Sequence, residues 1–251
     1  MTRVKTSEAV IGGNHASPGA IIVSHGQPSD PDPAETILAG LAARIAALMP
    51  GWTIASATLA KPGALETAAG QAGADALVYP LFMTDGWFTR TTLPKRLGRA
   101  NAQILPPLGT DPALRDVAIR YLDAELAQQG WLAKDTSLIV ASHGSGKSRN
   151  SARDTERFAQ ALAARMQFAD IRAGYIEEPP FLKDAAQLGT SQAICLPFFA
   201  AEGGHVIEDI PEALDKAGFS GLRLPPIGTH SRIPAMIASA LHNAARQLTG
   251  A

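Results

Sequence analysis

Residues 138–144 read LIVASHG and residues 20–26 read AIIVSHG, so one pattern occurs twice, 118 residues apart. In each copy a short apolar run is followed directly by Ser-His-Gly. Such a run before a glycine predicts a buried strand that ends in a sharp turn. Ligand sites of parallel α/β sheets form beyond the carboxyl ends of the strands, so His25 and His143 are candidate functional residues.

The rest of the chain alternates short apolar runs with longer stretches of apolar residues at helical spacing. Strands are expected at 20–24, 54–59, 76–79, 103–105, 137–142, 171–176, 192–197 and 222–224. Helices are expected at 34–48, 63–72, 91–99, 112–128, 151–166, 181–188, 206–217 and 234–248. This alternation predicts an α/β protein with mostly parallel sheets.

Further matches occur in the same order in both parts of the chain, at nearly the same offset as the Ser-His-Gly pair. The tetrapeptide LAAR at 41–44 recurs at 162–165, and LPPLGT at 105–110 recurs as LPPIGT at 224–229. A repeat of more than 100 residues is too long for the unit of a solenoid. The matches therefore predict a duplication.

The duplication predicts two homologous three-layer α/β halves, related by a pseudo-two-fold axis with a cleft between them. The first half spans residues 19–130 and the second residues 131–251. Residues 1–18 have no clear period and are expected to be a flexible lead-in.

Composition excludes several classes of protein. With 46% hydrophobic and 18% charged residues among 251, the chain is not disordered throughout. A net charge of -1 does not indicate a partner nucleic acid. The single cysteine, Cys195, makes neither an internal disulfide nor a multi-cysteine zinc site. No apolar run suits a membrane span or a signal peptide, so we expect a cytoplasmic protein without a membrane partner.

Two further segments of the second half carry metal-ligand side chains after expected strands. One contains Glu177 and Glu178, and the other ends in Gly203-Gly204-His205. A parallel sheet would bring His143, Glu177 and His205 to one edge. Two imidazoles and a carboxylate suit cobalt, iron, nickel or zinc, and they leave coordination positions open.

Structural roles stay open for several of these residues. The two glutamates also fit a solvated loop ahead of Pro179. Glu208 and Asp209 lie in the first turn of an expected helix, where carboxylates favour the helix dipole. The sequence does not choose between this role and a functional one.

The first half lacks the equivalent set. Aligning the halves on prolines that recur at the same spacing places Phe88 opposite His205 and Ala60 opposite Glu177. The site of the first half is therefore degenerate, and this half is expected to form a wall of the cleft. Trp87 and Phe88 could stack against a flat ligand there, or belong to the core.

The segment GSGKS at 144–148 resembles a phosphate-binding loop. The pattern GxxxxGK[ST] requires glycine at position 141, where the chain has Ala141. No nucleotide cofactor is therefore expected, although a backbone anion site stays open.

The segment LPFFAAEGGHVIEDIP at 196–211, together with the Ser-His-Gly turn and Glu177, resembles the class II tetrapyrrole chelatases. The likeness is greatest to sirohydrochlorin chelatases of the CbiX/SirB type in their long, two-half form, and it covers roughly residues 19–249. It implies the chelatase fold and an enzyme that inserts a divalent metal into sirohydrochlorin without ATP, in cobalamin or siroheme biosynthesis.

The resemblance also implies roles for individual residues. His143 and His205 would bind the metal and accept protons, and Glu177 would be the metal-binding carboxylate. The metal is a substrate, with Co²⁺ expected first and Fe²⁺ or Ni²⁺ as alternatives. A non-catalytic carrier of metal or tetrapyrrole with the same fold is the alternative function.

The tetrapyrrole partner implies further contacts. Its carboxylates would meet basic groups in the cleft, for which Lys147 and Arg149 are the first candidates. The other expected contacts are His25, Trp87 and Phe88, with Arg90 and Arg153 as weaker basic candidates. A monomer with pseudo-symmetric halves, or a weak homodimer, is expected.

Overall fold

The computed structural model describes residues 17–98, 103–145, 150–188 and 190–250. Its first sheet has the strand order β2-β1-β3, and all pairs are parallel. The strands are β1 (Gly19–Ser24), β2 (Thr53–Thr58) and β3 (Leu77–Pro80). The helices of this half are α1 (Pro31–Ala47), α2 (Ala64–Ala72), α3 (Leu93–Leu97) and α4 (Pro112–Gln129).

The second sheet has the order β5-β4-β6-β7 and is also parallel. Its strands are β4 (Ser137–Ser142), β5 (Asp170–Tyr175), β6 (Ala193–Pro197) and β7 (Leu222–Arg223). The helices are α5 (Asn150–Ala163), α6 (Leu182–Ala185), α7 (Ile210–Lys216) and α8 (Ile233–Thr249). The expected α/β fold with parallel sheets is confirmed.

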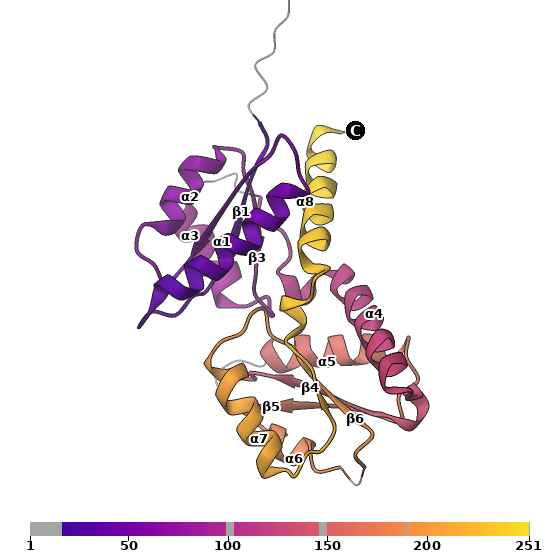
Figure 1. The fold of residues 1–251 in the computed structure, drawn as a ribbon. Helices are drawn as coiled ribbons and strands as arrows, with labels where there is room; N and C mark the ends of the chain where they lie inside the picture. The colour runs from indigo at the N-terminus through magenta and orange to yellow at the C-terminus, as the bar shows by residue number, and fades with distance from the viewer. Residues whose placement is uncertain (1–16, 99–102, 146–149, 189, 251) are drawn as a thin grey trace, which may run out of the picture.

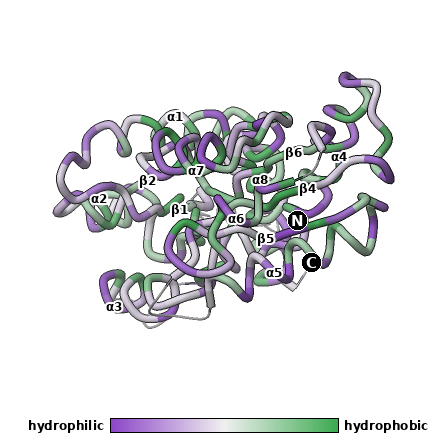
Figure 2. Tube along the Cα trace, turned by 90° about the horizontal axis from the view of Figure 1, so that it is seen from below, coloured by the Kyte–Doolittle hydropathy of each residue, from purple (hydrophilic) through white to green (hydrophobic). Residues whose placement is uncertain are grey.

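The strands with near-continuous apolar runs are the central ones. All residues of β4 and β6 are buried, as are five of the six in β1. A parallel strand covered by helices on both faces has no side that needs polar residues. Hydrophobic residues accordingly gather inside the molecule, and hydrophilic residues predominate on outer loops and helix faces (Figure 2).

The two halves exchange their last helices. Helix α8 packs against α1 and β3 of the first half, whereas α4 packs against α5 of the second (Figure 1). Trp52 meets His242 of α8 edge-on at 5.4 Å, and Arg165 pairs with Asp116 of α4 at 3.1 Å. The last helix of each half therefore packs against elements of the other half.

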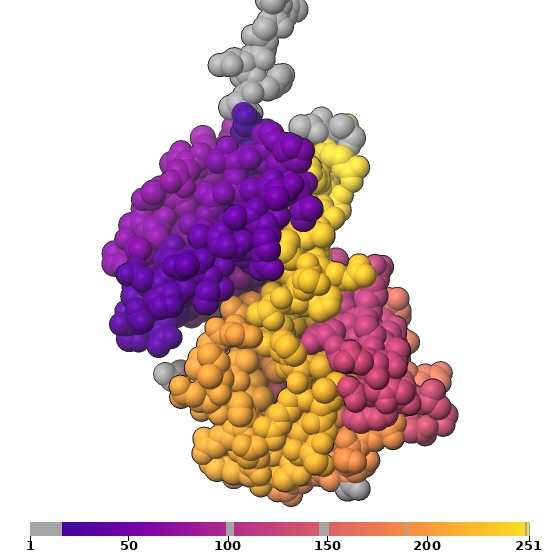
Figure 3. Space-filling view, in the orientation of Figure 1, coloured from indigo at the N-terminus to yellow at the C-terminus, as the bar shows by residue number. Residues whose placement is uncertain are grey.

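This exchange produces one core that is continuous between the halves. It contains residues of β1, β3, β4 and β6 together with α1, α4, α5 and α8. A second cluster lies under α2 and α3, and a third under α6 and α7. The space-filling view shows α8 lying against the N-terminal lobe (Figure 3).

The described residues include short helical turns that the sequence analysis did not predict as separate elements. Two are π-helical: η1 (Phe88–Thr92) precedes α3, and η4 (His205–Asp209) precedes α7. Three are 3₁₀ turns: η2 (Leu108–Thr110), η3 (Ala133–Asp135) and η5 (Ile227–Thr229). The strand expected at 103–105 is a single bridge between Ile104 and Val78. Two prolines follow at once, and they have no N–H to extend the pairing.

Most of the expected lead-in, residues 1–16, lies outside the described residues. In the described parts of the chain, no helix has the length and apolar composition that crossing a bilayer requires.

Candidate metal-binding active site

Three side chains of the second half meet beyond the carboxyl edge of its sheet. His143 follows β4, Glu177 follows β5, and His205 begins η4 after β6. One ligand atom from each lies within 4.8 Å of the other two. The Nε2 atoms of the histidines are 3.0 Å apart, and His143 Nε2 is 3.5 Å from Glu177 Oε1.

The sheet topology accounts for this meeting. Strand β4 lies between β5 and β6, so the segments leaving the three strands are neighbours. The Glu177 N–H donates to the His143 carbonyl at 3.0 Å, which continues the β4–β5 pairing one step past the strands. Gly144 then turns with φ 72°, a conformation that side chains with a Cβ rarely adopt.

Hydrogen bonds of the other ring nitrogens set the tautomers of both histidines. His143 Nδ1 lies 2.9 Å from the Gly144 carbonyl, and His205 Nδ1 lies 2.6 Å from Asp209 Oδ2. Both partners are acceptors, so each Nδ1 carries the proton and donates it. In the neutral rings, both Nε2 lone pairs are then left for the shared site.

Two lone pairs 3.0 Å apart need a cation between or beside them. A proton can bridge the two nitrogens as an N–H···N hydrogen bond. A metal ion is the other option: two nitrogens each about 2.05 Å from one ion and at a right angle would be about 2.9 Å apart. The pair is therefore suited to hold either a proton or a metal, with Glu177 as the anionic third ligand.

The structure separates the neighbouring carboxylates that the sequence left open. Glu178 is not one of the three converging side chains, and its Oε1 accepts from the Ser145 N–H at 2.7 Å. Asp209 contacts His205, whereas Glu208 is exposed. Glu177 and Asp209 thus belong to the site.

The first half repeats this geometry with other side chains. His25 and Phe88 have ring centroids 4.4 Å apart at 85°, the same values as His143 and His205. The Ala60 N–H donates to the His25 carbonyl at 2.9 Å, as Glu177 does to His143. The alignment of Phe88 with His205 and of Ala60 with Glu177 is confirmed.

The counterpart of Asp209 in this geometry is Thr92, the last residue of η1. Its Oγ1 is buried, and among the described residues it has no hydrogen-bond partner. Phe88 stands where the second half has His205, so the first half has no ring N–H that could donate to Thr92 Oγ1.

The residues expected to contact the substrate differ in their exposure and in whether the structure describes them. Trp87 is 65% exposed and touches Phe88 edge-on at 5.1 Å, while Phe88 also packs against Phe82. Lys147 and Arg149 lie outside the described residues. That these residues and His25 bind substrate stays a prediction.

The surroundings shift the pKa of two further groups, the carboxyl that pairs with the candidate Arg90 and the thiol of the single cysteine. Arg90 donates to Asp85 at 2.7 Å, and this hydrogen bond lowers the pKa of the Asp85 carboxyl. Burial raises the pKa of the Cys195 thiol to about 12, so Cys195 offers no thiolate near neutral pH.

The fold and the candidate site together define a class: an α/β protein of two similar halves, one of which brings two histidines and a carboxylate together in a geometry suited to a divalent metal. The chain belongs to the CbiX family, whose model matches residues 19–125 and again residues 137–244. The resemblance read from the sequence is thereby confirmed.

Individual relatives agree with this assignment. The structure of a CbiX described as the terminal enzyme for biosynthesis of siroheme in denitrifying bacteria is 45% identical, with a TM-score of 0.83 over 90% of this chain and 99% of that one. SirB from Bacillus subtilis with Fe³⁺ shares the fold at 14% identity, with a TM-score of 0.73 over 92% and 96% of the two chains.

A probable sirohydrochlorin cobaltochelatase of Halobacterium salinarum is 23% identical over 162 residues. This match spans 54% of the present chain and 55% of the relative. The chain thus matches only about half the length of that relative.

Proposed function

We propose that the chain is a sirohydrochlorin chelatase, which inserts a divalent metal into the tetrapyrrole without ATP. The observation that carries the proposal is the pair of Nε2 atoms 3.0 Å apart with a carboxylate beside them. The family membership and the 45% identity to a CbiX support it.

The reaction replaces two pyrrole N–H protons by one M²⁺ ion, so charge is conserved when two protons leave. His143, His205 and Glu177 would bind the ion and remove part of its hydration shell. As the macrocycle nitrogens replace these ligands, the freed imidazoles would be available to accept the departing protons. One pair of histidines thereby serves both the incoming and the outgoing cation.

The three ligand side chains are 39 to 49% exposed. A planar macrocycle could therefore approach the ion from the open side. Exposed Trp87 offers a flat apolar surface for such a ligand.

Cobalt is the metal we propose first, in line with the name of the Halobacterium salinarum relative. Iron is the second candidate, because the CbiX of known structure is described as an enzyme of siroheme biosynthesis. Two imidazoles and a carboxylate accept either ion, and affinity among them follows the Irving–Williams order rather than biological use. A cytoplasmic location and a monomeric or weakly dimeric state stay predictions.

An anaerobic absorbance time course tests the proposal. The protein is mixed with sirohydrochlorin and Co²⁺, Fe²⁺ or Ni²⁺, with protein-free controls for spontaneous insertion. His143→Ala and His205→Ala should abolish the catalysed spectral change. His242→Ala, which removes a histidine of α8 outside the site, should retain it.

Two other results would contradict the proposal. Tight binding of metal or tetrapyrrole with no rate above the control would indicate the carrier function. A rate that survives both histidine substitutions would place the chemistry elsewhere in the molecule.

A further inference from the structure

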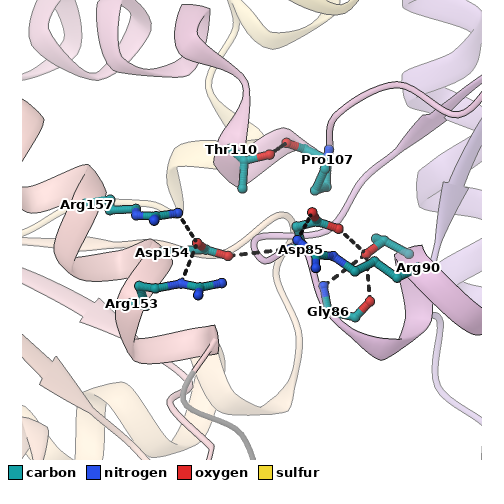
Figure 4. A network of polar contacts seen from close by, with 9 residues as sticks. Asp85, Gly86, Arg90, Pro107, Thr110, Arg153, Asp154 and Arg157 are labelled. Atoms are coloured by element: carbon teal, nitrogen blue, oxygen red, sulfur yellow. Dashed lines mark hydrogen bonds and ion pairs between the residues drawn. The ribbon is translucent and has the colours of Figure 1, made fainter.

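A buried carboxylate of the second half contacts the first half. The side chain of Asp154 on α5 is 3% exposed. Its Oδ2 accepts from the backbone N–H of Asp85 at 3.1 Å, across 69 residues of sequence (Figure 4). A carboxylate this deeply buried is costly unless it is paired and hydrogen-bonded, so its partners indicate its role.

The charged partners of Asp154 are held loosely. Arg153 Nε and Arg157 Nη1 lie 3.9 and 3.7 Å from Oδ1, beyond ordinary hydrogen-bond distance. The side chains of Arg153 and Arg157 are 47 and 63% exposed. Among the described residues, the close contact of Asp154 is therefore the one to the Asp85 backbone.

Hydrogen bonds within residues 85–90 stabilise the segment that contains Asp85. The Asp85 carboxylate accepts from Arg90 at 2.7 Å and from the Thr89 hydroxyl at 2.9 Å. The Gly86 N–H donates to Thr89 Oγ1 at 3.0 Å. Trp87 lies inside this turn. Holding the Asp85 backbone therefore also constrains the backbone that carries Trp87.

The next residue of α5, Thr155, contacts the central strand of its own half. Thr155 is fully buried, and its hydroxyl is 2.9 Å from the hydroxyl of Ser142, which directly precedes His143. Two consecutive residues thus tie α5 to two segments. Asp154 contacts the first-half segment that carries the exposed Trp87, and Thr155 contacts the end of β4, directly before His143.

We propose that Asp154 is a positioning residue that fixes the Trp87 segment relative to His143, and thereby shapes the surface on which a planar macrocycle binds at the metal site. This inference rests on the proposed function for the identity of the ligand. It makes a separate prediction about the protein without ligand, because the link through Asp85 exists there as well.

Two substitutions separate the parts of the contact. Asp154→Asn keeps an oxygen that can accept from Asp85 and removes only the charge. Asp154→Ala removes both. Glu156→Gln is the matched control, because Glu156 is an exposed acid on the same helix.

Binding is measured separately for Co²⁺ alone and for sirohydrochlorin alone. We expect Asp154→Ala to weaken sirohydrochlorin binding about tenfold, as the loss of one hydrogen bond to a charged acceptor implies. Co²⁺ affinity should stay within about twofold, because the metal ligands are held by the second sheet itself. In turnover, the variant should raise KM more than it lowers kcat, and Asp154→Asn should fall between it and the parent.

A second readout needs no ligand. The chain has three tryptophans, so 5-fluorotryptophan labelling gives three ¹⁹F resonances, and Trp87→Phe assigns the one of interest. Asp154→Ala should shift or broaden the Trp87 resonance and leave those of Trp52 and Trp131 in place. Glu156→Gln should change none of them.

The inference is overturned if folded Asp154→Ala keeps both the Trp87 resonance and the sirohydrochlorin affinity. It is also overturned if Co²⁺ and sirohydrochlorin affinities fall together, which would indicate a general structural role. If Asp154→Ala does not fold, Asp154→Leu, which is close in size and cannot accept the hydrogen bond, carries both readouts. A parent protein that binds Co²⁺ but not sirohydrochlorin contradicts the proposed function instead, and the ¹⁹F spectrum still tests the link.

Discussion

Asp209→Asn is the substitution that tests most closely how the site holds a metal. Asp209 accepts from His205 Nδ1 at 2.6 Å and so keeps the Nε2 lone pair directed at the shared site. Asparagine has nearly the same shape and lacks the charge. Its amide can also rotate to donate to Nδ1, which favours the tautomer with the proton on Nε2, where it blocks a metal.

The expected size of the effect follows from the geometry and the exposure. Loss of a hydrogen-bond partner of a metal-binding histidine typically lowers metal affinity by about 10- to 100-fold. The side chains of His205 and Asp209 are 45 and 42% exposed, so solvent screens part of the interaction. We therefore expect the lower end of the range, about a tenfold weaker Kd for Co²⁺, or about 1.4 kcal/mol.

Titration of the apo protein with Co²⁺, followed by its visible absorption, gives the Kd. Glu208→Gln is the control, because it removes the same charge from the adjacent, exposed position. An unchanged Kd in folded Asp209→Asn would refute the argument. Equal weakening in both variants would also refute it, since the effect would then be one of net charge.

Three further predictions follow from other parts of the molecule. Ala60→Glu combined with Phe88→His should create a second Co²⁺ site, seen as a metal stoichiometry that rises by one; an unchanged stoichiometry would show that the halves match less closely than their rings suggest. Cys195 should not react with Ellman's reagent at pH 8 until the protein is unfolded; rapid reaction of the folded protein would contradict its burial. Burial, with the nearby Arg232, lowers the pKa of His230, so stability should be full above about pH 6.5 and fall as the pH drops below that value. Urea midpoints at pH 7.5 and 5.0 check this, and the difference should shrink in His230→Gln.

The convergence of His143, Glu177 and His205 was accessible to sequence reasoning because all three residues follow apolar strands. A parallel sheet places such positions at one edge whatever the details of packing. The same regularity explains why aligning two prolines correctly paired Phe88 with His205. The choice between Glu208 and Asp209 could not be made, since both positions suit a helix N-terminus and only the turn geometry selects Asp209.

Features that depend on how the halves meet were not predictable. The contact of Asp154 with Asp85 joins residues whose own segments show no pattern of pairing. The exchange of α4 and α8 is likewise invisible in hydrophobic periodicity, because a helix has the same apolar stripe whichever sheet it covers. Periodicity also does not separate the π turns from the α helices that follow them. Pro94 and Pro211, which have no N–H, mark their ends.

A single-turnover transfer experiment tests the central claim most directly. The protein is loaded with one equivalent of Co²⁺ and mixed anaerobically with sirohydrochlorin and an excess of a strong chelator, which captures any ion that leaves the site. The account predicts formation of cobalt-sirohydrochlorin by the parent protein and none by His205→Ala, because the ion passes directly from the histidine pair to the macrocycle. Complete capture of the cobalt by the chelator, with no metallated product from the parent protein, would contradict it.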